Sequence, residues 1–181
     1  MNELNEIPTS GFRLLRVVTI HQAYSIAIDE ETILGVEDRR IAVDWDWSVS
    51  EDREFDVFLG VALSGSQEAP ETVHAEIVGE FELEGTVPSM TFRKFVHTAA
   101  PAILLPYVRQ IISDLTGRGP YGPYYLPSVN VVRMMQRYDF ETTGGAKQLR
   151  EDPELAKLYG WPTDVQLTLP SEQPQSSEQQ T

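Results

Sequence analysis

The chain has 181 residues, of which 41% are hydrophobic and 23% are charged, so it is long enough to bury a core and has the composition of a soluble globular domain. Its 28 acidic residues outnumber its 14 basic residues, and the resulting net charge of −14 disfavours binding to the phosphates of nucleic acids. It has no cysteine, which excludes disulfides, thiolate metal sites and cysteine nucleophiles.

The chain also lacks the features of a membrane or secreted protein. No apolar run reaches the roughly 18 residues of a membrane-spanning helix. Residues 1–11 are acidic and lack the apolar core of a secretion signal, so we expect a flexible arm and a cytoplasmic location. We expect a folded domain over 12–138 and an extension with a short helix over 139–169. Residues 170–181, rich in Ser, Glu, Gln and Pro, are predicted to be disordered.

The first half of the chain has the alternating pattern of β-strands. Apolar and polar residues alternate with a period of two, which is typical of strands with one buried and one wet face. The predicted strands cover residues 12–27, 40–49, 54–65 and 72–84. The links between the later strands are short and polar, which favours an antiparallel meander.

The second half changes to a helical period. Apolar residues from Ile103 recur at spacings of three and four, and Gly117, Gly119 and Pro120 end this predicted helix. Pro106 lies within the pattern and should kink the helix or lie in its first turn. A second helix is predicted from about Ser128. The predicted fold is therefore α+β, a four-stranded antiparallel sheet with two helices packed on one face. In the extension, residues 152–160 read as a short helix with Asp at its N-cap, Pro at its first position and Gly after its end.

No residue pattern indicates catalysis. Residues 117–122 match a GxGxxG dinucleotide motif, but they follow a helix, whereas the motif must follow a strand and begin a helix. The three histidines are far apart in the sequence and have no zincin spacing. We therefore predict a protein that is not an enzyme and that needs no cofactor or metal.

Two groups of side chains could contact partners. Tyr121, Tyr124 and Tyr125 lie in a loop of Pro and Gly, where they either contact a bound polypeptide or fold against their own helix. The second group is acidic and projects from one face of the fourth strand. It is either a solvated face or a docking surface for a basic partner, and consists of Glu76, Glu80, Glu82 and Glu84.

The helix and loop together resemble a family signature. Residues 104–109 read LLPYVR, and residues 118–130 run from Arg-Gly to Leu-Pro-Ser-Val-Asn. This order resembles that of the SecB protein-export chaperones, in which an LFPYAR helix runs into an Arg-Gly turn and a loop that ends in Pro-Val-Asn. The resemblance covers about residues 12–137 and includes Phe12-Arg13-Leu14 in the first strand.

The resemblance implies a holdase that binds unfolded polypeptides without ATP and passes them to SecA. It implies a tetramer, a dimer of dimers, with the interface residues Phe12, Leu14, Ile103, Tyr107 and Ile111. It also implies an apolar client groove beside the loop. The groove residues are Trp45, Trp47, Tyr121, Tyr124, Tyr125, Leu126 and Met134.

The chain departs from the SecB pattern at several positions. His21 and Ser25 stand where the family carries acidic residues that help to dock SecA, and residues 37–40 stand where a groove tryptophan is common. The segment after Asp139 is longer than usual. These departures fit a SecB-like chaperone that protects one client, such as the antitoxin of a toxin–antitoxin system. A scaffold domain that kept the fold and lost the groove is the further alternative.

Overall fold

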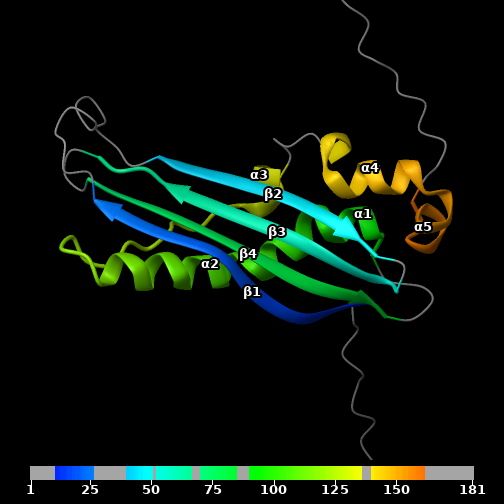
Figure 1. Ribbon diagram of the computed structural model, residues 1–181, viewed down its shortest axis with the longest axis horizontal. Coiled ribbons are helices and arrows are strands. Elements are labelled where there is room, and N and C mark those ends of the chain that lie inside the picture. Colours follow the sequence, from blue (N-terminus) through cyan, green and yellow to red (C-terminus); the bar gives the residue numbers. More distant parts are fainter. Residues whose placement is uncertain are drawn as a thin grey trace, which may run out of the picture.

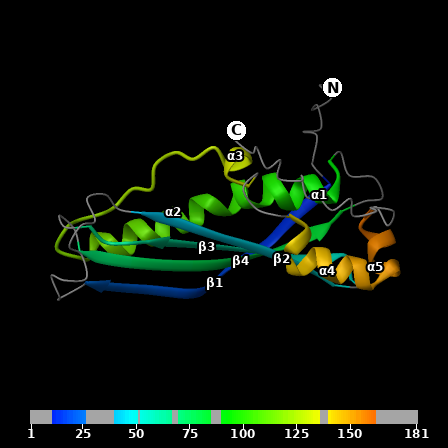
Figure 2. The same ribbon diagram turned by 90° about the horizontal axis from the view of Figure 1, so that it is seen from above.

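The fold is a four-stranded antiparallel sheet with helices on one face and at one end (Figures 1 and 2). The computed structural model describes residues 11–26, 40–50, 52–66, 70–84, 90–135 and 140–161. The predicted tail over 170–181 and, apart from Gly11, the predicted arm over 1–11 lie outside these residues. The strands are β1 (Phe12–Ile26), β2 (Ile41–Val49), β3 (Glu54–Leu63) and β4 (Glu71–Leu83). The α+β class predicted from the sequence is confirmed.

The order of the strands in the sheet is β1-β4-β3-β2. The predicted meander is confirmed for β2, β3 and β4, which follow one another through short turns. It is wrong for β1, which pairs with β4 and not with β2. The connection between β1 and β2 spans residues 27–40, far longer than a hairpin loop, so the chain can pass to the far edge of the sheet before β2 begins.

The alternation seen in the sequence separates a covered face of the sheet from an outer face. Phe55 and Phe81 are cross-strand partners, and both are buried beneath the helices. Strand β1 follows this pattern less strictly, because its pairing with β4 shifts at Leu15 and at Ile20. Each shift adds a residue that opposes no partner. Both extra side chains are exposed, and β1 therefore presents an apolar edge.

The main helical layer begins at Phe92, earlier than predicted. It consists of α1 (Phe92–Lys94), a π-helical turn η2 (Phe95–Ala99) and α2 (Ala100–Gly117). Thr91 caps its start by accepting a hydrogen bond from the amide of Lys94. Pro101 has no N–H to donate to the carbonyl four residues earlier, and the π turn comes directly before it. Pro106 lies on the exposed side of α2, whereas Leu104, Val108 and Ile112 are buried against the sheet.

The remaining helices are short. They are α3 (Val131–Met135), the 3-10 turn η3 (Phe140–Thr142), α4 (Gly144–Glu151) and α5 (Pro153–Leu158). The capping chemistry predicted for α5 is confirmed, because the Asp152 carboxylate accepts from the amides of Glu154 and Leu155. The sequence analysis missed α4. Its two glycines and few apolar residues give it a weak helical period.

Candidate functional site

The loop between α2 and α3, residues 118–130, is held by hydrogen bonds to its backbone. Thr116, at the end of α2, is fully buried and accepts from the amide of Tyr124 at 2.7 Å. Further along the loop, the guanidinium of Arg109 donates to the carbonyls of Leu126 at 3.1 Å and Pro127 at 2.6 Å. The Arg of the Pro-Tyr-Val-Arg motif therefore fixes the path of the loop as it runs back from the end of α2 toward α3 (Figure 2).

The end of the loop is fixed by a helix cap. The side-chain oxygen of Asn130 accepts from the amide of Arg133 at 3.0 Å, and the backbone carbonyl of Asn130 accepts from the amide of Met134 at 2.9 Å. This is the bonding pattern of an N-cap residue. The last residue of the Pro-Ser-Val-Asn segment therefore starts α3 and sets where the loop ends.

The side chains of this anchored loop divide into exposed and packed groups. Tyr125 is 73% exposed and Tyr121 is 46% exposed, whereas Leu126 is buried. Tyr124 and Met134 are half-buried and pack against the core. A loop with a fixed backbone and exposed tyrosine rings can bind apolar side chains without ordering itself first, which lowers the entropic cost of binding.

The structure places the predicted groove tryptophans in the core. Trp45 is buried and lies against the ring of His97, which itself bonds to the carbonyl of Met135 at 2.9 Å. Trp47 is only 1% exposed. The assignment of Trp45 and Trp47 to an open client groove therefore needs correction, since both side chains are almost fully buried.

Trp47 is covered by residues 140–161, which we call the C-terminal module. The ring of Trp161 lies 5.6 Å from that of Trp47, and a side chain at Gly145 would meet the Trp47 ring at 2.0 Å. The hydroxyl of Tyr159 lies 2.9 Å from the carbonyl of Ser50 and 2.8 Å from that of Glu54. The module therefore completes the core at one end of the sheet. Sequence reasoning missed this role, although Tyr159 and Trp161 were a signal of burial.

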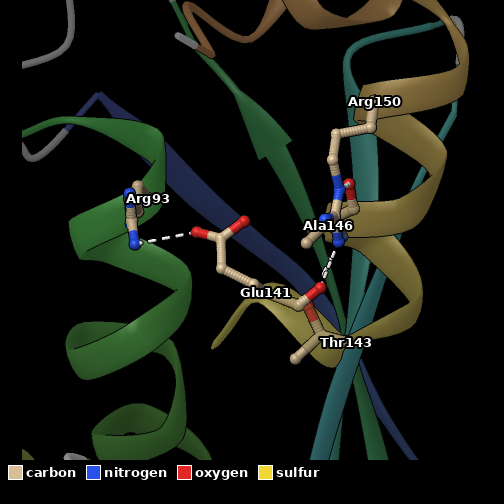
Figure 3. A network of polar contacts seen from close by, with 5 residues as sticks. All are labelled: Arg93, Glu141, Thr143, Ala146 and Arg150. Carbon is tan, nitrogen blue, oxygen red and sulfur yellow. Dashed lines mark hydrogen bonds and ion pairs between the residues drawn. The ribbon is translucent and has the colours of Figure 1, made fainter. Parts of the chain in front are cut away.

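Polar contacts join the module to the main helical layer and to the edge of β2. Glu141 forms an ion pair with Arg93 at 3.0 Å, and its carbonyl accepts from Arg150 (Figure 3). On the sheet side, the side chain of Gln148 accepts from the amide of Val49 at 3.0 Å. An edge amide of β2 is thereby satisfied by a side chain of α4.

A second candidate surface lies between β1 and the outer side of α2. Ile103 and Tyr107 are exposed, and Leu14 and Ile111 are half-buried. A hollow of about 400 Å³ opens here, lined by Leu14, Leu15, Arg16, Val17, Thr19, Ile77, Tyr107, Gln110 and Ile111. Phe12 does not belong to this surface, because it is buried and its ring stacks on Phe95 at 4.1 Å. The prediction that Phe12 lies at a subunit interface therefore needs correction, because its ring is part of the core.

Two arginines of β1 pair with three of the four glutamates of the predicted acidic face. Arg16 pairs with Glu80 at 2.6 Å, and Arg13 pairs with Glu82 and with Glu84. The hydrogen bonds and charges of these glutamates raise the pKa of both guanidinium groups. The fourth predicted residue, Glu76, contacts His74 at 3.2 Å. Sequence reasoning missed the arginines because cross-strand partners depend on the position of β1 in the sheet.

The outer face retains carboxylates on the side of β2 and β3. A hollow of about 400 Å³ there is lined by Ile20, Asp44, Trp45, Asp46, Phe58, Leu59, Gly60, Glu76 and Ile77. Nearby, burial and the carboxylate of Glu80 raise the pKa of Asp56. Asp46 also accepts from the amide of Gly144, so part of this charge positions the C-terminal module.

The described residues contain no group of three or more His, Asp or Glu side chains that could hold a metal ion. Within the same residues, no helix is long and apolar enough to cross a membrane.

The family model described as "Preprotein translocase subunit SecB" matches residues 37–141, more than half of the chain. The chain therefore belongs to the SecB family.

Similar proteins in other organisms agree with this. The protein-export protein SecB of Bartonella bacilliformis is 31% identical over 88 residues, which is 48% of this chain and 55% of that protein. The SecB of Xanthomonas campestris pv. campestris is 36% identical over 81 residues, which is 44% of this chain and 47% of that protein. The chain thus spans about half the length of these relatives.

One solved structure shares the fold. It is the SecB-like chaperone Rv1957 of Mycobacterium tuberculosis in complex with a ChAD peptide from the HigA1 antitoxin. The TM-score is 0.53 at 16% identity, over 66% of this chain and 91% of that chain. At this identity the likeness supports the fold alone. The C-terminal helices α4 and α5 lie beyond residues 37–141, which the family model matches.

Proposed function

We propose that this protein is a chaperone that binds non-native polypeptides and keeps them unfolded without consuming ATP. The observation that carries this proposal is the anchored loop. Thr116, Arg109 and Asn130 fix its backbone, while Tyr121 and Tyr125 remain exposed. Membership of the SecB family supports the same function, and no step of the proposal requires a reacting group.

The physical basis of binding is the burial of client side chains against tyrosine rings. A tyrosine presents a large apolar surface and a hydroxyl, so it tolerates many client sequences. Several weak contacts along an extended client can add up to firm binding without sequence specificity. The net charge of −14 keeps a protein with such a surface soluble, and we place its function in the cytoplasm.

We further propose that the chain assembles as a dimer of dimers. The exposed residues Ile103 and Tyr107 on α2 and the apolar edge of β1 support this assembly. An exposed apolar helix face beside an open strand edge is suited to a second copy of the same surface. Sedimentation velocity at micromolar concentration tests the assembly, and a stable monomer would contradict it.

Two destinations for the client are consistent with family membership. The first is delivery to SecA for export, and the description of the family model as a preprotein translocase subunit supports a role in export. The second is the protection of an antitoxin, and it is favoured by two observations. Arg13 and Arg16 pair with three of the four glutamates of the predicted docking face, and the Rv1957 chaperone, which shares the fold, is bound to an antitoxin peptide. Direct titration with SecA and with an antitoxin peptide separates the two.

The test of the chaperone function is the capture of a reduced, permanently unfolded protein, with its folded form as the control. We expect capture of the unfolded form alone and no effect of added ATP. If neither form binds, general chaperone activity is refuted, and a scaffold or single-client role takes its place.

A further inference from the structure

Tyr24 and Glu71 form a polar pair beneath the start of the loop. Glu71 is the first residue of β4 and is 0% exposed, although it carries a carboxylate. The hydroxyl of Tyr24, near the end of β1, donates to this carboxylate at 3.0 Å. Tyr24 pairs with Val73 on the covered face of the sheet, and Glu71 lies two residues before Val73 on that face. The side chains of Tyr24 and Glu71 therefore both point toward the helical layer.

The same hydroxyl touches the turn that follows α2. A Cβ built at Gly119 would lie 2.0 Å from the Tyr24 hydroxyl and 2.8 Å from the ring carbon that bears it. Any side chain at Gly119 must therefore displace Tyr24. The Gly of the Arg-Gly turn is required here because the hydroxyl already occupies that space.

Burying a carboxylate at this point is costly for folding. A buried charged group is rarely the most stable choice, and an apolar pair of similar size commonly gives equal or greater stability. Glu71 and Tyr24 instead hold a donor and an acceptor in fixed positions. Their contact joins the start of β4, the end of β1 and the first residues of the loop.

We infer that the Tyr24–Glu71 pair is a positioning element that sets where the loop of residues 118–130 leaves α2. This inference rests on the proposed chaperone function for its client readout, but the position of the loop can be measured without a client. The pair would act on the exposed ring of Tyr121 through the backbone, since the Tyr24 hydroxyl lies against Gly119 and only Pro120 separates Gly119 from Tyr121. Tyr24 lies on the strand edge proposed for assembly, so the pair also links that edge to the loop.

The central variant is Tyr24→Phe in the full chain, which removes only the hydroxyl. We expect amide hydrogen exchange in residues 118–124 to become about tenfold faster, the effect of losing one hydrogen bond to a charged group. Dissociation of an unfolded client should become about threefold to tenfold faster for the same reason. Exchange in β3 and the midpoint of chemical denaturation should stay close to those of the control.

The matched control is Ser25→Ala. Ser25 is the next residue of the same strand and bonds to Thr72 on the outer face, away from the loop. Its loss removes a hydroxyl from the same two strands without touching Gly119. Glu71→Gln is the conservative variant, because the amide oxygen still accepts from Tyr24, and its loop exchange should lie closer to the wild type than that of Tyr24→Phe.

Gly119→Ala gives an independent test from the loop side. Its methyl group displaces the Tyr24 hydroxyl, so exchange in residues 118–124 should also accelerate while β3 is unaffected. Unchanged loop exchange in both variants would overturn the inference. It would also be overturned if exchange in the loop and in β3 rose together with the loss of global stability, since the pair would then only support the fold. A wild-type protein that binds no unfolded chain would refute the proposed function and leave the exchange test intact.

Discussion

The loop between α2 and α3 and the C-terminal module use aromatic side chains in opposite ways. The loop exposes Tyr121 and Tyr125, and its backbone donates a hydrogen bond to Thr116 and accepts one from Arg109. The module buries Tyr159 and Trp161 against the sheet. The loop and the module have a similar number of aromatic residues, so the difference between them lies in what each segment packs against. It teaches that an aromatic segment can keep its rings exposed when its backbone is anchored independently of those rings.

The largest expected effect belongs to the module. Trp47→Ala removes the ring on which Gly145 and Trp161 pack and should lower the free energy of unfolding by about 3–5 kcal/mol, as for other buried aromatic residues. Urea denaturation followed by circular dichroism measures this. A loss below about 1 kcal/mol would mean that the module does not complete the core. The comparison between the two regions would then fail at its first step.

The second prediction concerns the loop. Replacing Tyr121 and Tyr125 together with Ser should weaken the binding of an unfolded client about tenfold, because aromatic anchors carry much of the energy of such interfaces. The denaturation midpoint should remain unchanged, since both rings are exposed. Tyr124 is left in place because it packs against the core. Fluorescence anisotropy with a labelled, permanently unfolded protein measures the affinity, and an unchanged value would place the client surface elsewhere.

The third prediction uses pH to follow the module. Burial raises the pKa of Tyr159 to about 12, although the hydrogen bond to Ser50 opposes the shift. In the unfolded chain the phenol ionises near pH 10. The stabilising contribution is therefore complete below pH 10 and is lost as the pH rises from 10 to 12. Wild-type stability should fall across this window by more than that of Tyr159→Phe.

The same variant should have a modest effect on stability at neutral pH. Tyr159→Phe removes the hydrogen bond to the turn between β2 and β3 and should cost about 1 kcal/mol there. The difference in unfolding free energy between wild type and variant should shrink from pH 8 to pH 11. Tyr125→Phe is the matched control because its ring is exposed. Equal pH dependence of wild type and Tyr159→Phe would show that the phenol is not buried against the carbonyls of Ser50 and Glu54.

The sequence predicted those parts of the fold that depend on local pattern. The alternation of Trp45 and Trp47 with Asp44 and Asp46 predicted β2 to within a residue of its observed bounds. The Asp152-Pro153 start of α5 was predictable because a cap depends on neighbouring residues alone. Such signals need no knowledge of what lies across the sheet.

The sequence could not predict contacts between distant segments. Arg13 and Arg16 meet the glutamates of β4 only because β1 lies beside β4, and nothing local to β1 specifies that neighbour. The burial of Trp47 likewise depends on Gly145, which is distant in the chain and reads locally as a weak helix position. The loop itself was predicted from its Pro and Gly residues, but the sequence left open which of its tyrosines are exposed and which pack against the core.

The smallest expected effect separates the two ways of anchoring. Arg93 joins the module through an ion pair with Glu141 and lies 5.8 Å from the Trp161 ring, but half of its side chain is exposed. An exposed ion pair contributes little, so Arg93→Gln should lower the free energy of unfolding by less than about 1 kcal/mol. Hydrogen exchange in α4 should change little as well, because buried rings hold the module. If Arg93→Gln released α4 while Trp47 stayed packed, polar contacts would anchor the module as they anchor the loop, and the contrast between the two regions would disappear.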